Sequence, residues 1–201
     1  MAIVINGSGT VTGLAVGGLP DGTVDAGTLA TNSVTAAKLE VSAITATDLP
    51  AGSVLQIVQE IWTTAAGSTV EDTWTDLLSL AITPSSSSSK IYAMYSISAA
   101  GQSGQRGGFR LARGSTPLGI ATSFGNRTAA GNAFMGNSDN NHDNHVFFYL
   151  DSPSTTSATS YKVQFHSENT TQVNFNYGWD NANDVTHYRS SSTLTLMEIA
   201  G

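Results

Sequence analysis

A ten-residue repeat in the first quarter of the chain constrains its folding more than any other feature. Three units align without gaps, from Gly22 to Thr31, from Asn32 to Val41 and from Ser42 to Ala51. Each unit places a β-branched residue, an alanine and a leucine in the same register, at Val24/Val34/Ile44, Ala26/Ala36/Ala46 and Leu29/Leu39/Leu49. One extended unit has no breadth, so it cannot bury these side chains within a single chain. Bundling identical chains about an axis solves the problem, and we therefore expect a homo-oligomer.

The same register predicts the local structure of each unit. Asp25, Thr35 and Thr45 follow the β-branched residues, and each is a good helix N-cap. Each unit is therefore expected to be a short extended piece, a cap, one helical turn and a break. We expect residues 21–52 to form a stalk, with a core made by Val24, Leu29, Val34, Leu39, Ile44 and Leu49. The alternative is a flexible low-complexity linker with an accidental repeat.

The glycine-rich residues 1–20 are expected to be an extended arm or a disordered end. This N-terminus has neither a basic region nor a long apolar region, so we do not expect a secretory signal. The longest apolar runs are too short to cross a bilayer. We expect synthesis in a cytoplasm and no membrane insertion.

Composition favours an all-β fold for the rest of the chain. Charged residues make up only 11% of the 201 residues, and polarity comes from serine, threonine, asparagine and glycine instead. These residues compete for backbone hydrogen bonds in helix interiors and suit strands and turns. The net charge of −7 and the scattered basic residues argue against nucleic-acid binding and a polybasic membrane contact. Without cysteine there is no disulfide, thiolate zinc site or catalytic thiol.

Residues 53–201 show many short segments with alternating faces, separated by turn residues. Within Lys90–Ala99, for example, Ile91, Ala93, Tyr95 and Ile97 alternate with more polar residues. Such spacing is typical of a sandwich or jelly roll, which we predict as the head domain. The predicted strands are Val54–Thr64, Trp74–Thr83, Lys90–Ala99, Gly108–Arg113, Leu118–Phe124, His145–Asp151, Ser160–Ser167, Gln172–Trp179 and Ser192–Ile199.

Two polar segments are candidate binding sites. In Asn137–His145, His142 and His145 are candidate metal ligands beside two aspartates; the alternative is a solvated loop rich in turn-forming residues. The second segment mixes aromatic side chains, which stack on sugars, with amides that hydrogen-bond hydroxyls. Its candidate receptor contacts are Tyr177, Trp179, Asn181, Asn183, His187 and Tyr188, and the alternative is an ordinary loop with a half-buried Trp179.

No motif predicts an enzyme. The chain has neither a Gly-x-Ser-x-Gly elbow nor a P-loop, and no helix is expected to follow the glycine-rich Gly101–Gly108. Polysaccharide-cleaving fibres need a pair of carboxylates in a groove, and the few acidic residues of the head show no such pairing. We expect no catalytic residues and no cofactor.

Several motifs resemble those of bacteriophage fibre proteins. The units Val34–Leu39 and Ile44–Leu49 resemble tail-fibre shaft repeats. The head motifs resemble the C-terminal domain of structural proteins of marine tailed phages, cyanophages included; they are Ser79–Ile91, Arg110–Ser115, Leu150–Pro153, Tyr161–Gln164 and Ser192–Ile199. The resemblance covers most of the chain, but this stalk is short for a long tail fibre.

The resemblance implies a homotrimer in the virion, assembled in the host cytoplasm. It implies a trimeric jelly-roll head of the tumour-necrosis-factor and C1q-like kind. Residues 1–20 would dock on other tail or capsid proteins, and the head would contact the host surface; the aromatic and amide segment makes a surface glycan one candidate receptor, which the sequence does not name. The alternative is a head-fibre or capsid decoration protein with a purely structural role.

Overall fold

The computed structural model describes residues 29, 31–35, 39–40, 43–136, 142–170, 172–180, 182–183, 185 and 187–201. The chain divides into two compact units, Met1–Thr45 and Ala46–Gly201. The predicted arm at 1–20 and Val24 lie outside the described residues, so the predicted division at 20 and 52 stays a prediction. In the third repeat unit a 3-10 helix, η2, spans Ala46–Asp48.

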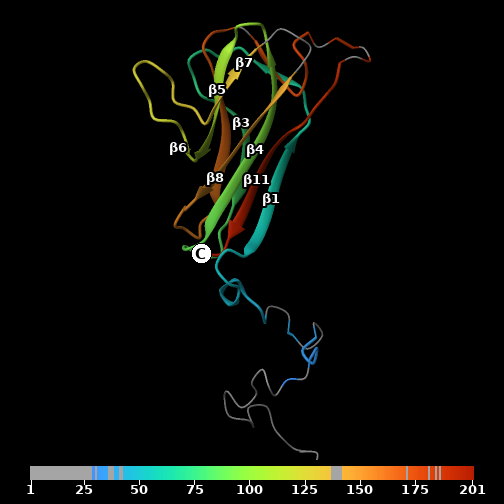
Figure 1. Ribbon diagram of the computed structural model, residues 1–201, viewed down its shortest axis with the longest axis vertical. Coiled ribbons are helices and arrows are strands. Elements are labelled where there is room, and N and C mark those ends of the chain that lie inside the picture. Colours follow the sequence, from blue (N-terminus) through green and yellow to red (C-terminus); the bar gives the residue numbers. More distant parts are fainter. Residues whose placement is uncertain are drawn as a thin grey trace, which may run out of the picture. The chain divides into compact units, whose positions relative to one another are not determined.

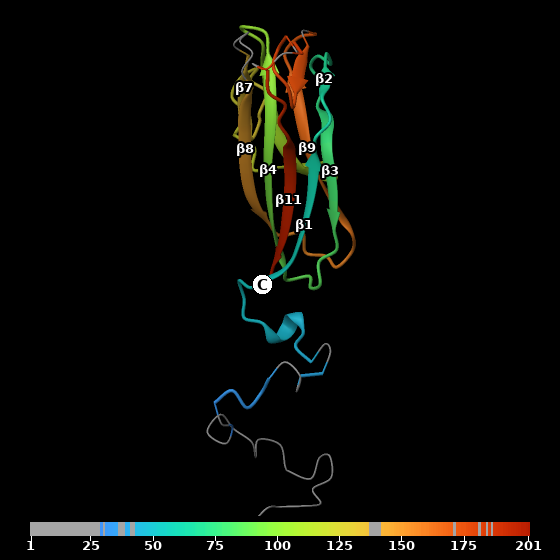
Figure 2. The same cartoon turned by 90° about the vertical axis from the view of Figure 1, so that its right-hand side faces the viewer.

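The second unit is a sandwich of two antiparallel sheets (Figure 1 and Figure 2). The first sheet contains β1 (Val54–Trp62), β2 (Ala66–Ser68), β4 (Lys90–Gly101), β8 (Asp143–Asp151), β10 (Val173–Phe175) and β11 (Ser192–Ile199). The second sheet contains β3 (Thr75–Ile82), β5 (Arg106–Arg113), β6 (Thr116–Leu118), β7 (Asn132–Met135) and β9 (Thr159–Ser167). The predicted all-β sandwich is confirmed.

The long strand β4 organises the first sheet. It pairs with β8 along one edge and with β11 and β10 along the other. Beyond these, β1 pairs with β11 and β2 pairs with β10. In the second sheet β9 lies between β3 and β5, and the other edge of β5 pairs with β6 and β7. The chain therefore crosses between the sheets repeatedly, and neighbours within a sheet are distant in sequence.

Alternation along the strands builds the core between the sheets. On β4 the side chains of Ile91, Ala93, Tyr95 and Ile97 are fully buried, as the sequence pattern predicts. Phenylalanines from β5, β9 and β10 meet them in the core. The ring centroids of Phe109 and Phe165 lie 5.1 Å apart, and those of Phe165 and Phe175 lie 5.3 Å apart. Each fully buried large apolar side chain contributes about 1.5–3 kcal/mol, so this aromatic cluster is a major source of stability.

One predicted strand is wrong and two short strands were not predicted. The segment Leu118–Phe124 contributes only Leu118 to β6, because Gly119 has a φ of 57°, which extended strands do not adopt. Instead the chain returns to β5 as β7, which lies within a stretch that shows little alternation. Strand β2 also went unpredicted, because three residues carry no readable period.

The serine run before β4 has a definite role at the end of the sandwich where β1 begins. Glu198 on β11 is buried and accepts hydrogen bonds from the backbone N and Oγ of Ser85, at 2.7 and 2.6 Å, and from Nε2 of Gln56, at 2.6 Å. At the same end, the N–H of Ala200 donates to the carbonyl of Ser53 at 2.8 Å.

Within the described residues, no helix has the length and apolar character that crossing a membrane requires.

Candidate functional site

Apolar side chains predominate on the outward face of the first sheet where β1, β11, β4 and β8 lie side by side. Strand register aligns Ile57, Met197, Tyr92 and Leu150 in one row, from β1 through β11 and β4 to β8. The next row contains Gln59, Thr195, Met94 and Phe148, and the third contains Ile61, Thr193, Ser96 and Val146. We call the large apolar members of these rows the apolar face: Ile57, Ile61, Tyr92, Met94, Val146, Phe148, Leu150 and Met197.

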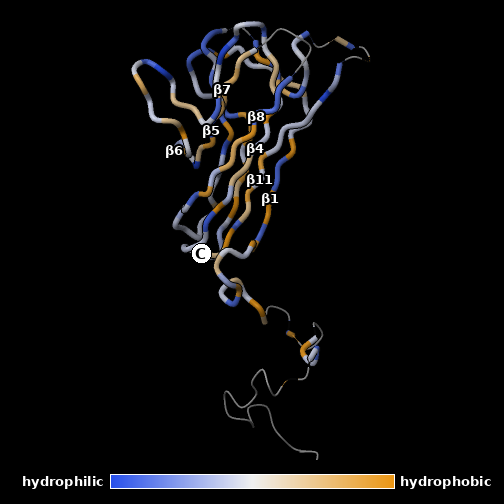
Figure 3. The backbone as a smooth tube through the Cα atoms, viewed as in Figure 1, coloured by the Kyte–Doolittle hydropathy of each residue, from blue (hydrophilic) through white to orange (hydrophobic). Residues whose placement is uncertain are grey.

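The apolar face is open to solvent in the single chain. Ile57 is 57% exposed, Phe148 is 61% exposed and Leu150 is 48% exposed. The three rows contain no charged side chain, and Nε2 of Gln59 donates to Oγ1 of Thr195 at 2.8 Å within them. Figure 3 shows hydrophobic colour recurring along β8, β4, β11 and β1, although part of it comes from core residues. Little polar surface would have to be desolvated if another surface covered this face.

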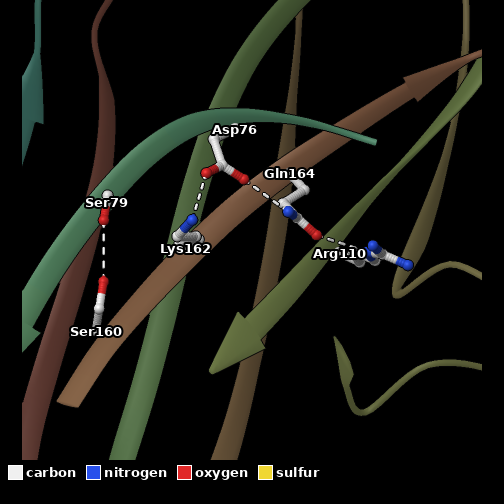
Figure 4. Close-up of polar contacts among 6 residues, drawn as sticks. All are labelled: Asp76, Ser79, Arg110, Ser160, Lys162 and Gln164. Atoms are coloured by element: carbon white, nitrogen blue, oxygen red, sulfur yellow. Dashed lines mark hydrogen bonds and ion pairs between the residues drawn. The ribbon is translucent and has the colours of Figure 1, made fainter. Parts of the chain in front are cut away.

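The outward face of the second sheet has the opposite character (Figure 4). Lys162 and Gln164 both donate to the carboxylate of Asp76, at 2.5 and 2.6 Å. Nε of Arg110 in turn donates to Gln164 at 2.8 Å. The hydrogen bonds from Lys162 and Gln164 hold the pKa of Asp76 below its usual value. A sandwich in water normally has polar outer faces, and only the second sheet follows that rule.

Such a contiguous apolar face indicates an interaction surface. Single exposed apolar residues are normal, but large continuous patches mark contacts with other proteins, ligands or membranes. In sequence, β8 shows the signal as His145-Val-Phe-Phe-Tyr-Leu150, where apolar residues occupy both faces instead of one. A continuous apolar run is typical of a strand that is covered on both faces. The predicted strand His145–Asp151 carries this signal, but no exposed apolar face was predicted from it.

The predicted stalk residues show the same lack of cover within the chain. Leu29, Val34, Leu39, Ile44 and Leu49 are between 39% and 57% exposed. The structure therefore describes no intramolecular partner that buries them. Their role as an oligomer core stays a prediction.

The predicted receptor residues do not form one exposed surface. Tyr177 is only 8% exposed, and its hydroxyl donates to Oδ1 of Asn174 at 2.9 Å. Tyr188 is 73% exposed, whereas Trp179 and His187 are half-buried. Asn183 is exposed and Asn181 lies outside the described residues. Nε2 of His187 lies 2.7 Å from Oδ1 of Asp180. Contact with a receptor through these residues stays a prediction.

His145, one of the two predicted metal ligands, lies against aromatic side chains of the core. The ring centroid of His145 lies 4.9 Å from that of Phe109 and 5.4 Å from that of Phe134. Burial lowers the pKa of His145, although Asp143 and a backbone hydrogen bond to Ala133 act in the opposite direction. Asp139 lies outside the described residues. Among those that are described, no group of three or more His, Cys, Asp or Glu side chains is arranged to hold a metal ion.

Comparisons with known proteins do not assign a family. No protein-family model matches the sequence, and no curated protein matches it. Among solved structures, a chain described as "Structure of infectious bursal disease virus Gx strain" matches with 13% sequence identity and a TM-score of 0.34. The match covers 74% of this chain and 39% of that chain, so the matched region spans well under half of the viral chain. Function must therefore be argued from the residues of this chain.

Proposed function

We propose that this protein is a homotrimeric structural fibre or appendage protein of a bacteriophage virion. In this proposal, residues 1–20 attach it to other tail or capsid proteins, and its head contacts the host surface. The observation that carries the assembly is the uncharged apolar face of the first sheet. The motif resemblance supports the virion assignment.

The strand order supports the finer fold assignment of a jelly roll. Strand pairing gives the order β8-β4-β11-β1 in the first sheet and β6-β5-β9-β3 in the second. This order matches the one expected of two interlocked Greek keys in double-sheet jelly rolls, which occur in viral proteins and lectins. Because many functions share this fold, it supports the proposal without determining it.

The stalk and the apolar face support oligomerisation together. Leu49, the last leucine of the repeat, is followed after four residues by Val54, where β1 begins. β1 carries Ile57 and Ile61 of the apolar face. Chains that bundle through their stalks would raise the local concentration of their heads, so a modest head contact would add to a weak stalk contact. Burying Phe148 alone would contribute about 2 kcal/mol per chain.

Light scattering on the full chain tests the proposed assembly. We expect a mass three times that of one chain. Phe148→Glu should give monomers, because assembly would bury an unpaired carboxylate between the heads at a cost on the order of 3–5 kcal/mol. The circular dichroism spectrum should not change, because Phe148 is exposed in the single chain. Phe124→Glu is the matched control, because Phe124 is also strongly exposed but lies outside the apolar face. A monomeric wild-type chain, or a trimer that withstands Phe148→Glu, contradicts the role of the face.

A capsid decoration or head-fibre protein is the second candidate. The apolar face favours it too if the face packs on the particle instead of on other copies of the chain. A monomer in solution, combined with labelling confined to the capsid of intact particles, would support this role over a tail fibre. An enzyme is not proposed, and release of reducing ends from host polysaccharide would contradict that expectation.

A further inference from the structure

A pocket with a volume of about 730 Å³ lies on the second sheet, away from the apolar face. It is bounded by β5, β7, the end of β9 and the loop that leads to β7. Pockets of roughly 300–1,000 Å³ are the usual size for small-molecule sites. The lining residues that matter for recognition are Asp72, Trp74, Arg106, Arg127, His166 and Glu168.

Aromatic and apolar groups form one wall of the pocket. Trp74 stands just before β3, with Cζ of Arg110 4.0 Å from its ring centroid and the ring of His166 at 5.2 Å. These two neighbours hold the indole in place. Gly108 on β5 leaves room for the loop, since a Cβ there would lie 2.8 Å from Cβ of Ala130. Met135 adds an exposed apolar side chain.

Charged groups of both signs line the other walls. Arg106 and Arg127 are exposed, and no carboxylate of the described chain lies within 4.0 Å of either guanidinium. Asp72 lies 3.8 Å from Nε2 of His166, and Glu168 completes the acidic side. Two guanidinium groups without a carboxylate partner among the described residues, together with an aromatic wall, form an incomplete site for an anion that also has an apolar face.

We propose that this pocket binds a pyranose that carries a carboxylate, the chemistry of acidic surface polysaccharides. Arg106 and Arg127 bind the carboxylate, because planar guanidinium groups match its geometry. Trp74 and Met135 contact the apolar face of the ring. The carboxylates of Asp72 and Glu168 accept hydrogen bonds from the hydroxyls, and the amide of Asn126 either accepts from a hydroxyl or donates to one. A neutral sugar forms no ion pair with either guanidinium group, so the pocket should prefer the acidic sugar to the neutral one.

This inference rests on the proposed function, because it names the ligand of the host-facing head. It is compatible with the proposed assembly, since the pocket lies on the second sheet and the apolar face lies on the first. The Tyr177–Tyr188 segment remains the alternative place of glycan contact. Binding at that segment is an outcome of the test.

Titration calorimetry on the full chain tests the pocket. The probes are an oligosaccharide of galacturonic acid and the matched neutral oligosaccharide of galactose. We expect the acidic probe to bind at least about tenfold more tightly than the neutral one. Arg127→Gln or Arg106→Gln should weaken acidic binding about tenfold or more, the usual value of a hydrogen bond to a charged group. Both residues are exposed, so neither change should alter the fold.

Arg189→Gln is the matched control, because it removes the same charge outside the pocket. It should leave binding unchanged, as should Tyr188→Ala. Equal binding of both probes, no binding of either, or a loss with Tyr188→Ala but not Arg127→Gln overturns the inference. Light scattering on the same samples separates the two proposals. A trimer that does not bind overturns only the pocket, and a monomer that binds overturns only the assembly.

Discussion

Glu198 shows how a single buried carboxylate is tolerated in this sandwich. Burial raises its pKa, but the hydrogen bonds from Ser85 and Gln56 outweigh burial and lower the pKa overall. Three donors lie within 2.7 Å of its oxygens. The ionised form is therefore preferred in the folded state, and it joins β11 to β1 and to the serine run.

Glu198→Gln should destabilise the protein by about 1–3 kcal/mol, since an amide nitrogen would face donors. The effect should depend on pH. A lowered folded-state pKa contributes stability that is present above the unfolded value of 4.5 and is lost as pH falls through the folded value. Urea unfolding across this range should show the variant and wild type converging at acidic pH. Glu60→Gln, on exposed β1 surface, is the control; equal effects of both changes would contradict this account.

At the scale of elements, β5 depends on close backbone approach to β9. A Cβ on Gly107 would lie 2.3 Å from the carbonyl oxygen of His166. This distance cannot be met without moving one strand, because the obstructing atom is backbone. The same strands carry one wall of the proposed pocket, so their spacing affects fold and site together.

Gly107→Ala should lower the free energy of unfolding by about 3 kcal/mol through overpacking. Gly104→Ala is the control, because a Cβ there meets no atom within 4 Å and only its φ of 82° opposes the change. That conformational cost is about 1 kcal/mol. Thermal unfolding followed by circular dichroism should rank the two variants in that order, and the reverse ranking would refute the packing argument.

At the scale of the whole molecule, residues 46–201 have their own core, and we propose that the repeat adds a second association surface. Removal of residues 1–45 should therefore leave the sandwich folded, with unchanged strand content by circular dichroism. The trimer should dissociate at a concentration about 100-fold or more above that of the full chain, because the stalk no longer gathers the heads. Sedimentation at a series of concentrations measures this. Equal dissociation of both chains would show that the repeat adds nothing to assembly.

Pattern strength explains which elements the sequence predicted. β4 and β11 alternate cleanly because one face enters the core, and their predicted starts at Lys90 and Ser192 agree with the structure. The unpredicted β2 and β7 are short, and their pairing with β10 and β5 depends on strands distant in sequence. Tyr177 looked exposed in a polar segment, but it is only 8% exposed and its hydroxyl donates to Asn174.

The sequence by itself determined the all-β class and most of the long strands, and it predicted oligomerisation through the repeat. The fold class and the long strands follow from period and composition, which are local. Only the tertiary structure decided that Ile57, Met197, Tyr92 and Leu150 share one row, and that Arg106 and Arg127 lie at one pocket. Strand order and register bring these residues together, and both arise from long-range pairing that no short stretch of sequence encodes.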